Sequence, residues 1–238
     1  MRINAGIYIV ERNSYITKGF VKDLYLGCPI NAIMHFNCFD YNEILIINNV
    51  DFIDSFELLQ LKKYSEASNK PKCYGGGIRL MEQAKSIIEI GFERVSLRSL
   101  YFSDISEYRK IIKFIGRQSV TLCLDVIFVD NDYYITVGAE RKLRVSEFSL
   151  DLVDYPGEVF INFINSNGRQ SGIDFRLAEL FLSKNWKINL NYCGGIKSKD
   201  EIDKLFEMGF TAVTLFSRAS TINNGADKLL NNNIFYEQ

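Results

Sequence analysis

The sequence predicts one α/β domain over residues 1–238, folded as a (β/α)8 barrel, the TIM barrel, with an internal half-barrel repeat. Its 238 residues, 47% of them apolar, are enough for one sizeable core of that fold. Eight short apolar segments alternate with segments of helical periodicity, which is typical of a parallel sheet covered by helices. Gly77 and Gly195 are 118 residues apart, and so are Ser99 and Ser217. We therefore expect two half-barrels, about 1–117 and 118–238.

The elements of the first half follow from periodicity and turn residues. Pro29 favours the start of a helix, and residues 11–22, which contain Gly19, predict a loop with a short hairpin. The continuous apolar run at Glu43–Asn48 is typical of a buried parallel strand. The expected strands are Ile3–Val10, Glu43–Asn48, a short segment ending at the glycines 75–77, and Arg94–Arg98; the expected helices are Pro29–Asn37, Phe56–Lys63, Leu80–Ile90 and Asp104–Ile115.

The second half follows the same pattern. Asp174 is expected to cap or open helix six, and Ser198–Glu201 is a capping box that starts helix seven. Residues 133–137 predict an inserted hairpin, and the asparagine-rich stretch Asn231–Asn233 has no assigned role. The expected strands are Val120–Val126, Glu158–Ile164, Ile188–Tyr192 and Ala212–Phe216, and helix five is expected at about Ser146–Val153.

Two glycine turns carry the clearest functional signal. Residues 75–78 read Gly-Gly-Gly-Ile and residues 194–196 read Gly-Gly-Ile, each between a predicted strand and a predicted helix. Glycine lets the backbone approach a ligand closely, and amide N–H groups near a helix N-terminus attract anions. Ser99 and Ser217, after the next strand of each half, can add hydroxyl donors. The pattern favours two anion sites at one barrel mouth; glycines that merely end strands are the structural alternative.

Composition narrows the chemistry. A net charge of −1 implies no attraction for nucleic acid or an anionic membrane, and no apolar run approaches the roughly 18 residues of a spanning helix. The five cysteines form no CxxC pair, so we expect reduced thiols in a cytoplasmic protein, with no disulfide and no metal site. His35, the only histidine, is interpreted as a surface or packing residue. No cofactor is indicated, and acid–base chemistry falls to carboxylates, lysine, tyrosine or cysteine.

These stretches resemble the cyclase subunit (HisF) of imidazole glycerol phosphate synthase and its isomerase relative in histidine biosynthesis. The resemblance covers nearly the whole chain and implies a barrel whose two glycine turns bind a phosphorylated small molecule, a bisphosphate. It places Gly77 and Ser99 at one phosphate, and Gly195 and Ser217 at the other. The segments that carry it are Gly75–Arg79, Arg94–Ser96, Leu124–Val126, Gly168 with Ser171–Asp174, and Gly194–Gly195.

The resemblance also implies two acid–base aspartates, at the ends of strands one and five, because ring closure requires protons to be both added and removed. Asp125 matches the second. Alignment from Arg2 puts Tyr8 at the first position, and no other alignment supplies a carboxylate. A tyrosine, with a pKa of about 10, is a poor base at neutral pH. The substrate site is expected to be rebuilt, since the sequence departs from the family pattern at Asn48, Arg98, Asn165, Asn167 and Arg169.

Another part of that family's apparatus is matched more closely. In the cyclase, ammonia from a glutaminase enters the barrel through its N-terminal face, past a gate of one arginine, one lysine and two glutamates at strand starts. By residues alone, four alternating charges at strand starts predict a salt-bridged ring over the barrel bottom, which is either a gate or a stability cluster. The matching positions, with arginine in place of the lysine, are Arg2, Glu43, Arg94 and Glu158.

The kept entrance and the missing aspartate resemble one branch of this family, the HisF-like proteins (WbuZ type) of surface-polysaccharide gene clusters. That branch implies a class I glutaminase (HisH-like) partner and an ATP-dependent amidotransferase acting on an acetamido sugar. Two alternatives remain open. One is a lyase, the cyclase of histidine biosynthesis, in which Cys123 or Tyr8 works beside Asp125. The other is a non-catalytic phosphosugar-binding barrel.

Overall fold

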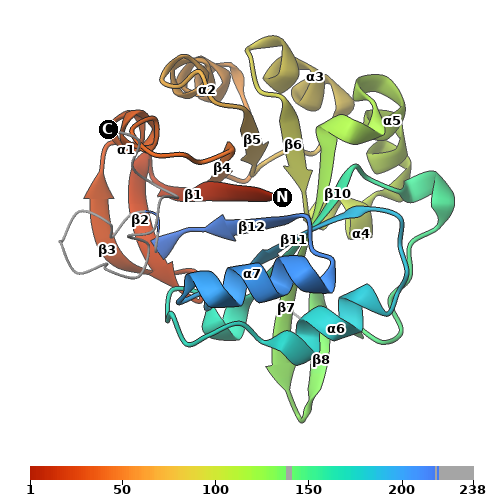
Figure 1. The fold of residues 1–238 in the computed structure, drawn as a ribbon. Coiled ribbons are helices and arrows are strands. Elements are labelled where there is room, and N and C mark those ends of the chain that lie inside the picture. The colour runs from red at the N-terminus through yellow and green to blue at the C-terminus, as the bar shows by residue number, and fades with distance from the viewer. Residues whose placement is uncertain (138–140, 218, 220–238) are drawn as a thin grey trace.

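The computed structural model describes residues 1–137, 141–217 and 219, and within these residues eight parallel strands close into a barrel (Figure 1). Each strand pairs with its neighbour, β12 pairs with β1, and β10 pairs with β7, so the sheet has no open edge within the barrel. The predicted (β/α)8 fold is confirmed. The barrel strands are β1 (Arg2–Val10), β4 (Glu43–Asn48), β5 (Lys72–Gly75), β6 (Arg94–Leu97), β7 (Val120–Val129), β10 (Glu158–Phe163), β11 (Asn189–Cys193) and β12 (Ala212–Leu215).

Helices surround the barrel, and side chains at their starts satisfy the first free amides. The side chains of Asp54, Asp104, Asp174 and Ser198 each accept a bond from the backbone N–H three residues later. The predicted caps at Asp174 and Ser198 are therefore present. The helices are α1 (Pro29–Phe36), α2 (Ser55–Glu66), α3 (Met81–Glu89), α4 (Ser99–Ser103), α5 (Ile105–Ile115), α6 (Phe175–Leu182) and α7 (Lys199–Met208), with short 3-10 turns η1 (Arg117–Ser119), η2 (Leu152–Asp154) and η3 (Ile164–Ser166).

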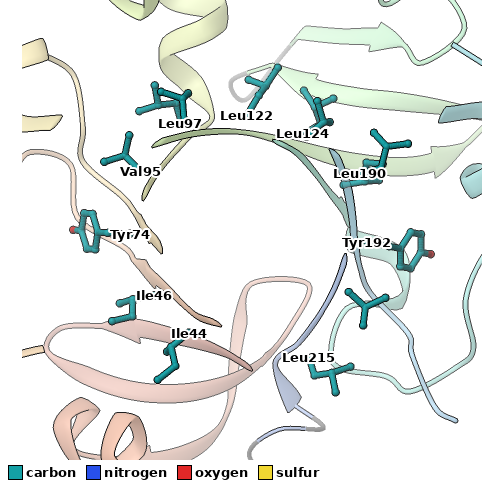
Figure 2. Close-up of a cluster of buried hydrophobic side chains, with 14 of the residues drawn as sticks. Ile44, Ile46, Tyr74, Val95, Leu97, Leu122, Leu124, Leu190, Tyr192 and Leu215 are labelled. Carbon is teal, nitrogen blue, oxygen red and sulfur yellow. The ribbon is translucent and has the colours of Figure 1, made fainter. Parts of the chain in front are cut away.

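Side-chain alternation along the strands separates two cores. One set of side chains points outward and packs under the helices, as Figure 2 shows for Ile44, Tyr74 and Leu190. The other set points into the barrel and forms a smaller cluster. Because successive residues of a strand face opposite sides, this parity also decides which polar side chains enter the barrel. The inward cluster comprises Leu45, Cys73, Cys123, Phe160 and Cys193, with Ile47 and Phe216 packed against it.

Two hairpins extend the strands at the carboxyl end of the barrel. After β1 the chain forms β2 (Asn13–Lys18) and β3 (Val21–Gly27), a longer hairpin than the one expected within residues 11–22. Strand β7 runs on past the barrel and pairs with β8 (Asp132–Val137), which pairs with β9 (Arg141–Arg144). Both insertions therefore follow strands whose carboxyl ends lie at the barrel mouth.

The prediction of a helix at about Ser146–Val153 is wrong. That stretch is irregular apart from the short turn η2. Its buried residues are Phe148 and Leu150, two positions apart, which is an extended rather than a helical spacing. The Lys184 ammonium donates to the carbonyls of Ser146 and Phe148, which supplies hydrogen bonds that a helix would otherwise make. The tail stretch Asn231–Asn233 lies outside the described residues.

The two glycine turns have the same backbone conformation, as the repeat predicts. Gly76 and Gly77 have φ of +128° and +65°, and Gly194 and Gly195 have φ of +118° and +78°. At Gly76 a Cβ would lie only 1.9 Å from the carbonyl oxygen of Asn48. Glycine is needed there both for the backbone conformation and for the close approach of β4.

We expect Gly76→Ala to destabilise the barrel much more than Gly116→Ala. Gly116 also has a positive φ, +84°, but a Cβ there would meet nothing within 4 Å. Conformation alone costs about 1–2 kcal/mol at a left-handed position, and Gly76→Ala adds a backbone clash to that cost. Urea unfolding of the two variants measures the difference. Equal losses of unfolding free energy would show that the approach of Asn48 is not tight.

Candidate functional site at the two ends of the barrel

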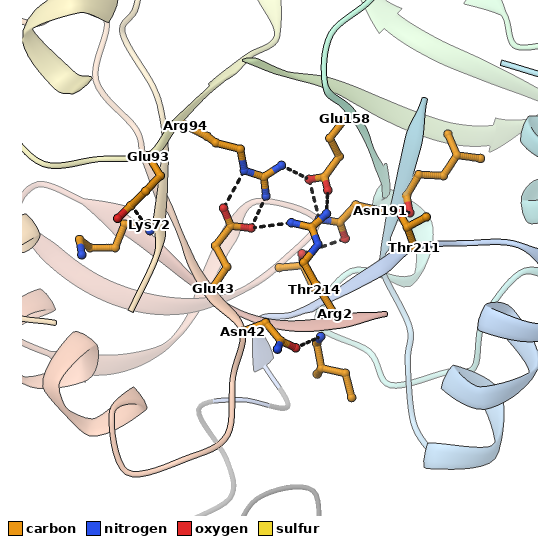
Figure 3. Close-up of polar contacts among 12 residues, drawn as sticks. Arg2, Asn42, Glu43, Lys72, Glu93, Arg94, Glu158, Asn191, Thr211 and Thr214 are labelled. Atoms are coloured by element: carbon orange, nitrogen blue, oxygen red, sulfur yellow. Dashed lines mark hydrogen bonds and ion pairs between the residues drawn. The ribbon is translucent and has the colours of Figure 1, made fainter. Parts of the chain in front are cut away.

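Four predicted charges meet at the amino end of the barrel in one closed ring (Figure 3). Arg94 bonds Glu43 through Nε and Nη2, with Nε 2.8 Å from Oε1, and its Nη1 lies 3.2 Å from Oε1 of Glu158. Arg2 donates to Glu158 and lies 3.4 Å from Glu43. Each arginine thus bridges both glutamates. The sequence prediction of a ring of alternating charge agrees with this geometry.

Because the ring is buried, each of its charges needs a partner of opposite charge. The glutamate side chains are 5% and 1% exposed, Arg94 is 13% exposed, and Arg2, at 31%, is the member nearest to solvent. Burial raises the pKa of Glu43 above its ordinary value, and the Arg94 guanidinium opposes that rise. Glu158 has a further partner, since Asn191 Nδ2 donates to its Oε1 at 3.1 Å. The carboxylates are stable in this place because cations and amides meet them.

A cavity of about 490 Å³ opens at the other, carboxyl end of the strands. It is large enough for a metabolite-sized ligand. Of the predicted site residues, Tyr8, Gly77, Ser99 and Asp125 line it, and so does Arg98. The structure therefore brings the first glycine turn and the candidate acid–base pair together at one mouth.

Asp125 is held by partners on both carboxylate oxygens. Arg98 Nη1 donates to Oδ2 at 2.7 Å, and Asn162 Nδ2 donates to Oδ1 at 2.7 Å. Asn167 in turn donates to the Asn162 side-chain oxygen at 3.2 Å. The residue as a whole is 3% exposed. These two hydrogen bonds fix the orientation of the Asp125 carboxylate at the base of the cavity.

Tyr8 shares that environment but does not replace a carboxylate. Burial raises the pKa of its hydroxyl above the usual 10.0; the nearby Arg98 lowers it and Asp125 raises it. Tyr8 is therefore a protonated hydrogen-bond donor at neutral pH, not a base. Cys123 is no better, because burial raises the pKa of its thiol well above the ordinary value. Two carboxylates, Asp125 and Asp51, line the cavity, but neither Tyr8 nor Cys123 supplies a base in place of the strand-one aspartate.

The two predicted anion sites border cavities of different volume. The first turn, with Gly77 and Ser99, faces the large cavity. The second, with Gly195, borders a hollow of only about 20 Å³, and the following loop closes on it: Gly172 N donates to Gly195 O at 2.8 Å. Ser217 comes directly after Phe216, a residue that lines both spaces. Within the described residues, the first site is open and the second is narrow.

Asn162 and Phe216 are among the mouth residues that sequence reasoning missed. Asn162 has the same strand parity as Glu158, which was predicted, so alternation along β10 could have placed it inside the barrel. Phe216 lies over Gly6, where a Cβ would be 2.6 Å from its ring. No local signal pointed to that packing, because the two residues are far apart in the sequence. His35 packs its ring against Phe39 with a centroid separation of 4.9 Å, which agrees with its interpretation as a packing residue.

The described residues contain no group of three or more histidine, cysteine or acidic side chains placed to hold a metal ion. In the same part of the chain, no helix is long and apolar enough to cross a membrane.

Comparison with known proteins connects this geometry to a family. A family model described as "Histidine biosynthesis protein" matches residues 19–219. A Vibrio vulnificus protein, provisionally named imidazole glycerol phosphate synthase subunit hisF3, is 30% identical over 90% of this chain and 87% of its own length. A Pseudomonas aeruginosa protein, provisionally named as subunit hisF2, is 31% identical over 87% and 84%. The subunit HisF of an Exiguobacterium strain is 29% identical over 69% and 68%.

We expect Arg94→Ala to lower the free energy of unfolding by about 3–5 kcal/mol, because it leaves two buried carboxylates without their shared cation. The matched control is Arg144→Ala on β9. Arg144 is 52% exposed and also lies near two carboxylates, and such surface pairs contribute at most about 1 kcal/mol. Chemical denaturation of both variants provides the measurement. A small loss for Arg94→Ala would mean that the ring does not support the barrel.

Proposed function

Because the chain belongs to the histidine biosynthesis protein family and is HisF-like, we propose that it is the barrel subunit of a glutaminase-dependent synthase. In this proposal a class I glutaminase docks at the amino end of the strands and releases ammonia there. The observation that carries the proposal is the closed ring of Arg2, Glu43, Arg94 and Glu158 at the strand starts. A neutral ring lets neutral ammonia pass while its buried charges exclude free ions.

The mouth is proposed to receive a phosphorylated small molecule. Gly77 and Ser99 face a cavity of about 490 Å³, and Arg79 lines the same wall. Backbone amides at such a turn suit a phosphate group. We propose Gly195 and Ser217 for a second phosphate, which would require the loop at Gly172 to move from its bond with Gly195.

Two acceptors for the ammonia are supported by different observations. The names of the relatives favour the imidazole glycerol phosphate synthase reaction, in which this subunit is the cyclase, a lyase. The mouth favours another acceptor, because the family's strand-one aspartate is matched by Tyr8 and Arg98 occupies one side of Asp125. In that second candidate, ammonia goes on to an ATP-dependent amidotransferase for a surface-polysaccharide sugar.

The first test is functional contact with a glutaminase. We expect the purified chain to raise glutamine hydrolysis by a class I glutaminase of the same genome about tenfold, a usual strength for coupling between two sites. Arg2→Ala, at the most exposed member of the ring, should weaken the stimulation, whereas Arg144→Ala, at the mouth end, should preserve it. If the chain neither binds nor stimulates any such glutaminase, the proposal fails and a phosphosugar-binding barrel becomes the better interpretation.

The second test separates the two acceptors. We expect the chain not to restore growth of a histidine auxotroph that lacks the cyclase, because a clamped Asp125 has no second acid–base partner in Tyr8. The matched variant is Tyr8→Asp combined with Arg98→Asn, which supplies a carboxylate and releases Asp125. Growth with the unchanged chain would assign the acceptor to histidine biosynthesis. Growth with the double variant alone would identify these two residues as the block.

A further inference from the structure

A buried polar layer lies inside the barrel and lacks hydrogen-bond partners. Asn4 is 0% exposed, and neither its Oδ1 nor its Nδ2 has a partner among the described residues. The same is true of Thr121 Oγ1, in a residue that is 2% exposed. Buried polar groups of this kind are normally satisfied, because leaving them unpaired costs stability. Three such atoms in one barrel interior indicate a site for a small polar molecule.

Strand register places this layer directly next to the ionic ring. Asn4 pairs with Glu43 across β1 and β4, and Thr121 pairs with Glu158 across β7 and β10. Asn4 has the inward parity of Arg2, while Ala5 on the same strand belongs to the outward core. Thr121 has the parity of Cys123, which faces inward. Both side chains therefore enter the barrel at the level of the ring carboxylates.

The surroundings restrict what the layer can hold. Thr121 lies beside the thiol of Cys73, which is only a weak hydrogen-bonding group. On the mouth side follow apolar and sulfur-containing side chains, among them Leu45 and Phe160, which would strongly disfavour an ion. On the other side, the two guanidinium groups and two carboxylates of the ring pair with one another and leave no net counter-charge for an ion. The ligand must be small and neutral, and it must both donate and accept hydrogen bonds.

We propose that the layer of Asn4 and Thr121 binds one such molecule, and that in the working complex this molecule is ammonia on its way from the ring to the mouth. This assignment rests on the proposed function. The Asn4 amide offers an acceptor and two donors, and the Thr121 hydroxyl offers one of each. The layer replaces the hydrogen bonds that ammonia loses when it leaves solvent, just before the path becomes apolar.

High-resolution crystal structures of the whole chain test the site itself. We expect a density peak within hydrogen-bonding distance of the Asn4 amide, and we expect its loss in Asn4→Leu combined with Thr121→Val. Thr121→Val alone is nearly isosteric and covers the case in which the double variant does not fold. The matched control is Thr214→Val, whose hydroxyl already bonds Asn191 Oδ1 at 3.0 Å; it should keep the peak. A wild-type barrel without density beside Asn4 would overturn the proposal.

Transfer in the glutaminase complex tests the assignment to ammonia. With glutamine as the nitrogen source, Thr121→Val should lower the amount of acceptor aminated per glutamine hydrolysed by about fivefold, the factor that one net hydrogen bond contributes. With ammonium chloride supplied at the mouth, it should match the unchanged chain. Unchanged coupling in a variant that has lost the density would mean a structural water site and would overturn the ammonia assignment. If the unchanged chain shows no glutaminase coupling at all, the proposed function fails, and the crystallographic result still decides whether the site exists.

Discussion

The closed ring of ion pairs at the strand starts is the interaction on which the rest of the barrel depends. Charges beneath a close-packed sheet are tolerated only when opposite charges and amides meet them, and here Arg94 joins Glu43 to Glu158 while Arg2 closes the circuit. The four residues come from β1, β4, β6 and β10; β1 and β4 are neighbours, and β6 and β10 lie farther round the barrel. The ring therefore holds strands from both halves in register. The positions of the inward side chains nearer the mouth depend on that register.

The barrel interior changes character in steps along its axis. The amide of Asn4 and the hydroxyl of Thr121 lie at the level of the ring carboxylates. Toward the mouth follow a cluster that contains three buried thiols and Phe160, and then the polar cavity at Asp125. An ion would have its highest free energy among these apolar side chains, whereas a small neutral molecule would lose little free energy there. This order of layers suits the proposed path for uncharged ammonia, and packing for stability alone gives no reason for the unpaired amide of Asn4.

Period-two alternation explains why much of the interior could be predicted from the sequence. Glu43 and Arg94 stand at strand starts with inward parity, which agrees with the ring that the family resemblance implied. The helix expected at 146–153 failed because Lys184, more than thirty residues away, bonds the carbonyls of that stretch. The contact of Arg98 with Asp125 was equally invisible, since it depends on how a long side chain reaches across to the next strand. Local patterns give the face of a residue, and long-range partners decide what it does there.

Residues at the two ends of the barrel can be substituted independently, because the inward apolar cluster around Leu45 and Phe160 separates the two ends. Arg98 illustrates this: its side chain is 56% exposed at the mouth and its guanidinium bonds Asp125, far from the ring at the strand starts. A cation at that position adds positive charge to the wall of the cavity, and it also hydrogen-bonds the Asp125 carboxylate. Under the proposed function, this arginine favours an anionic ligand at the mouth, and it ties the one aspartate that matches the family's acid–base pair. A subunit that only delivers ammonia to a bound acceptor gains from the first effect and loses nothing by the second.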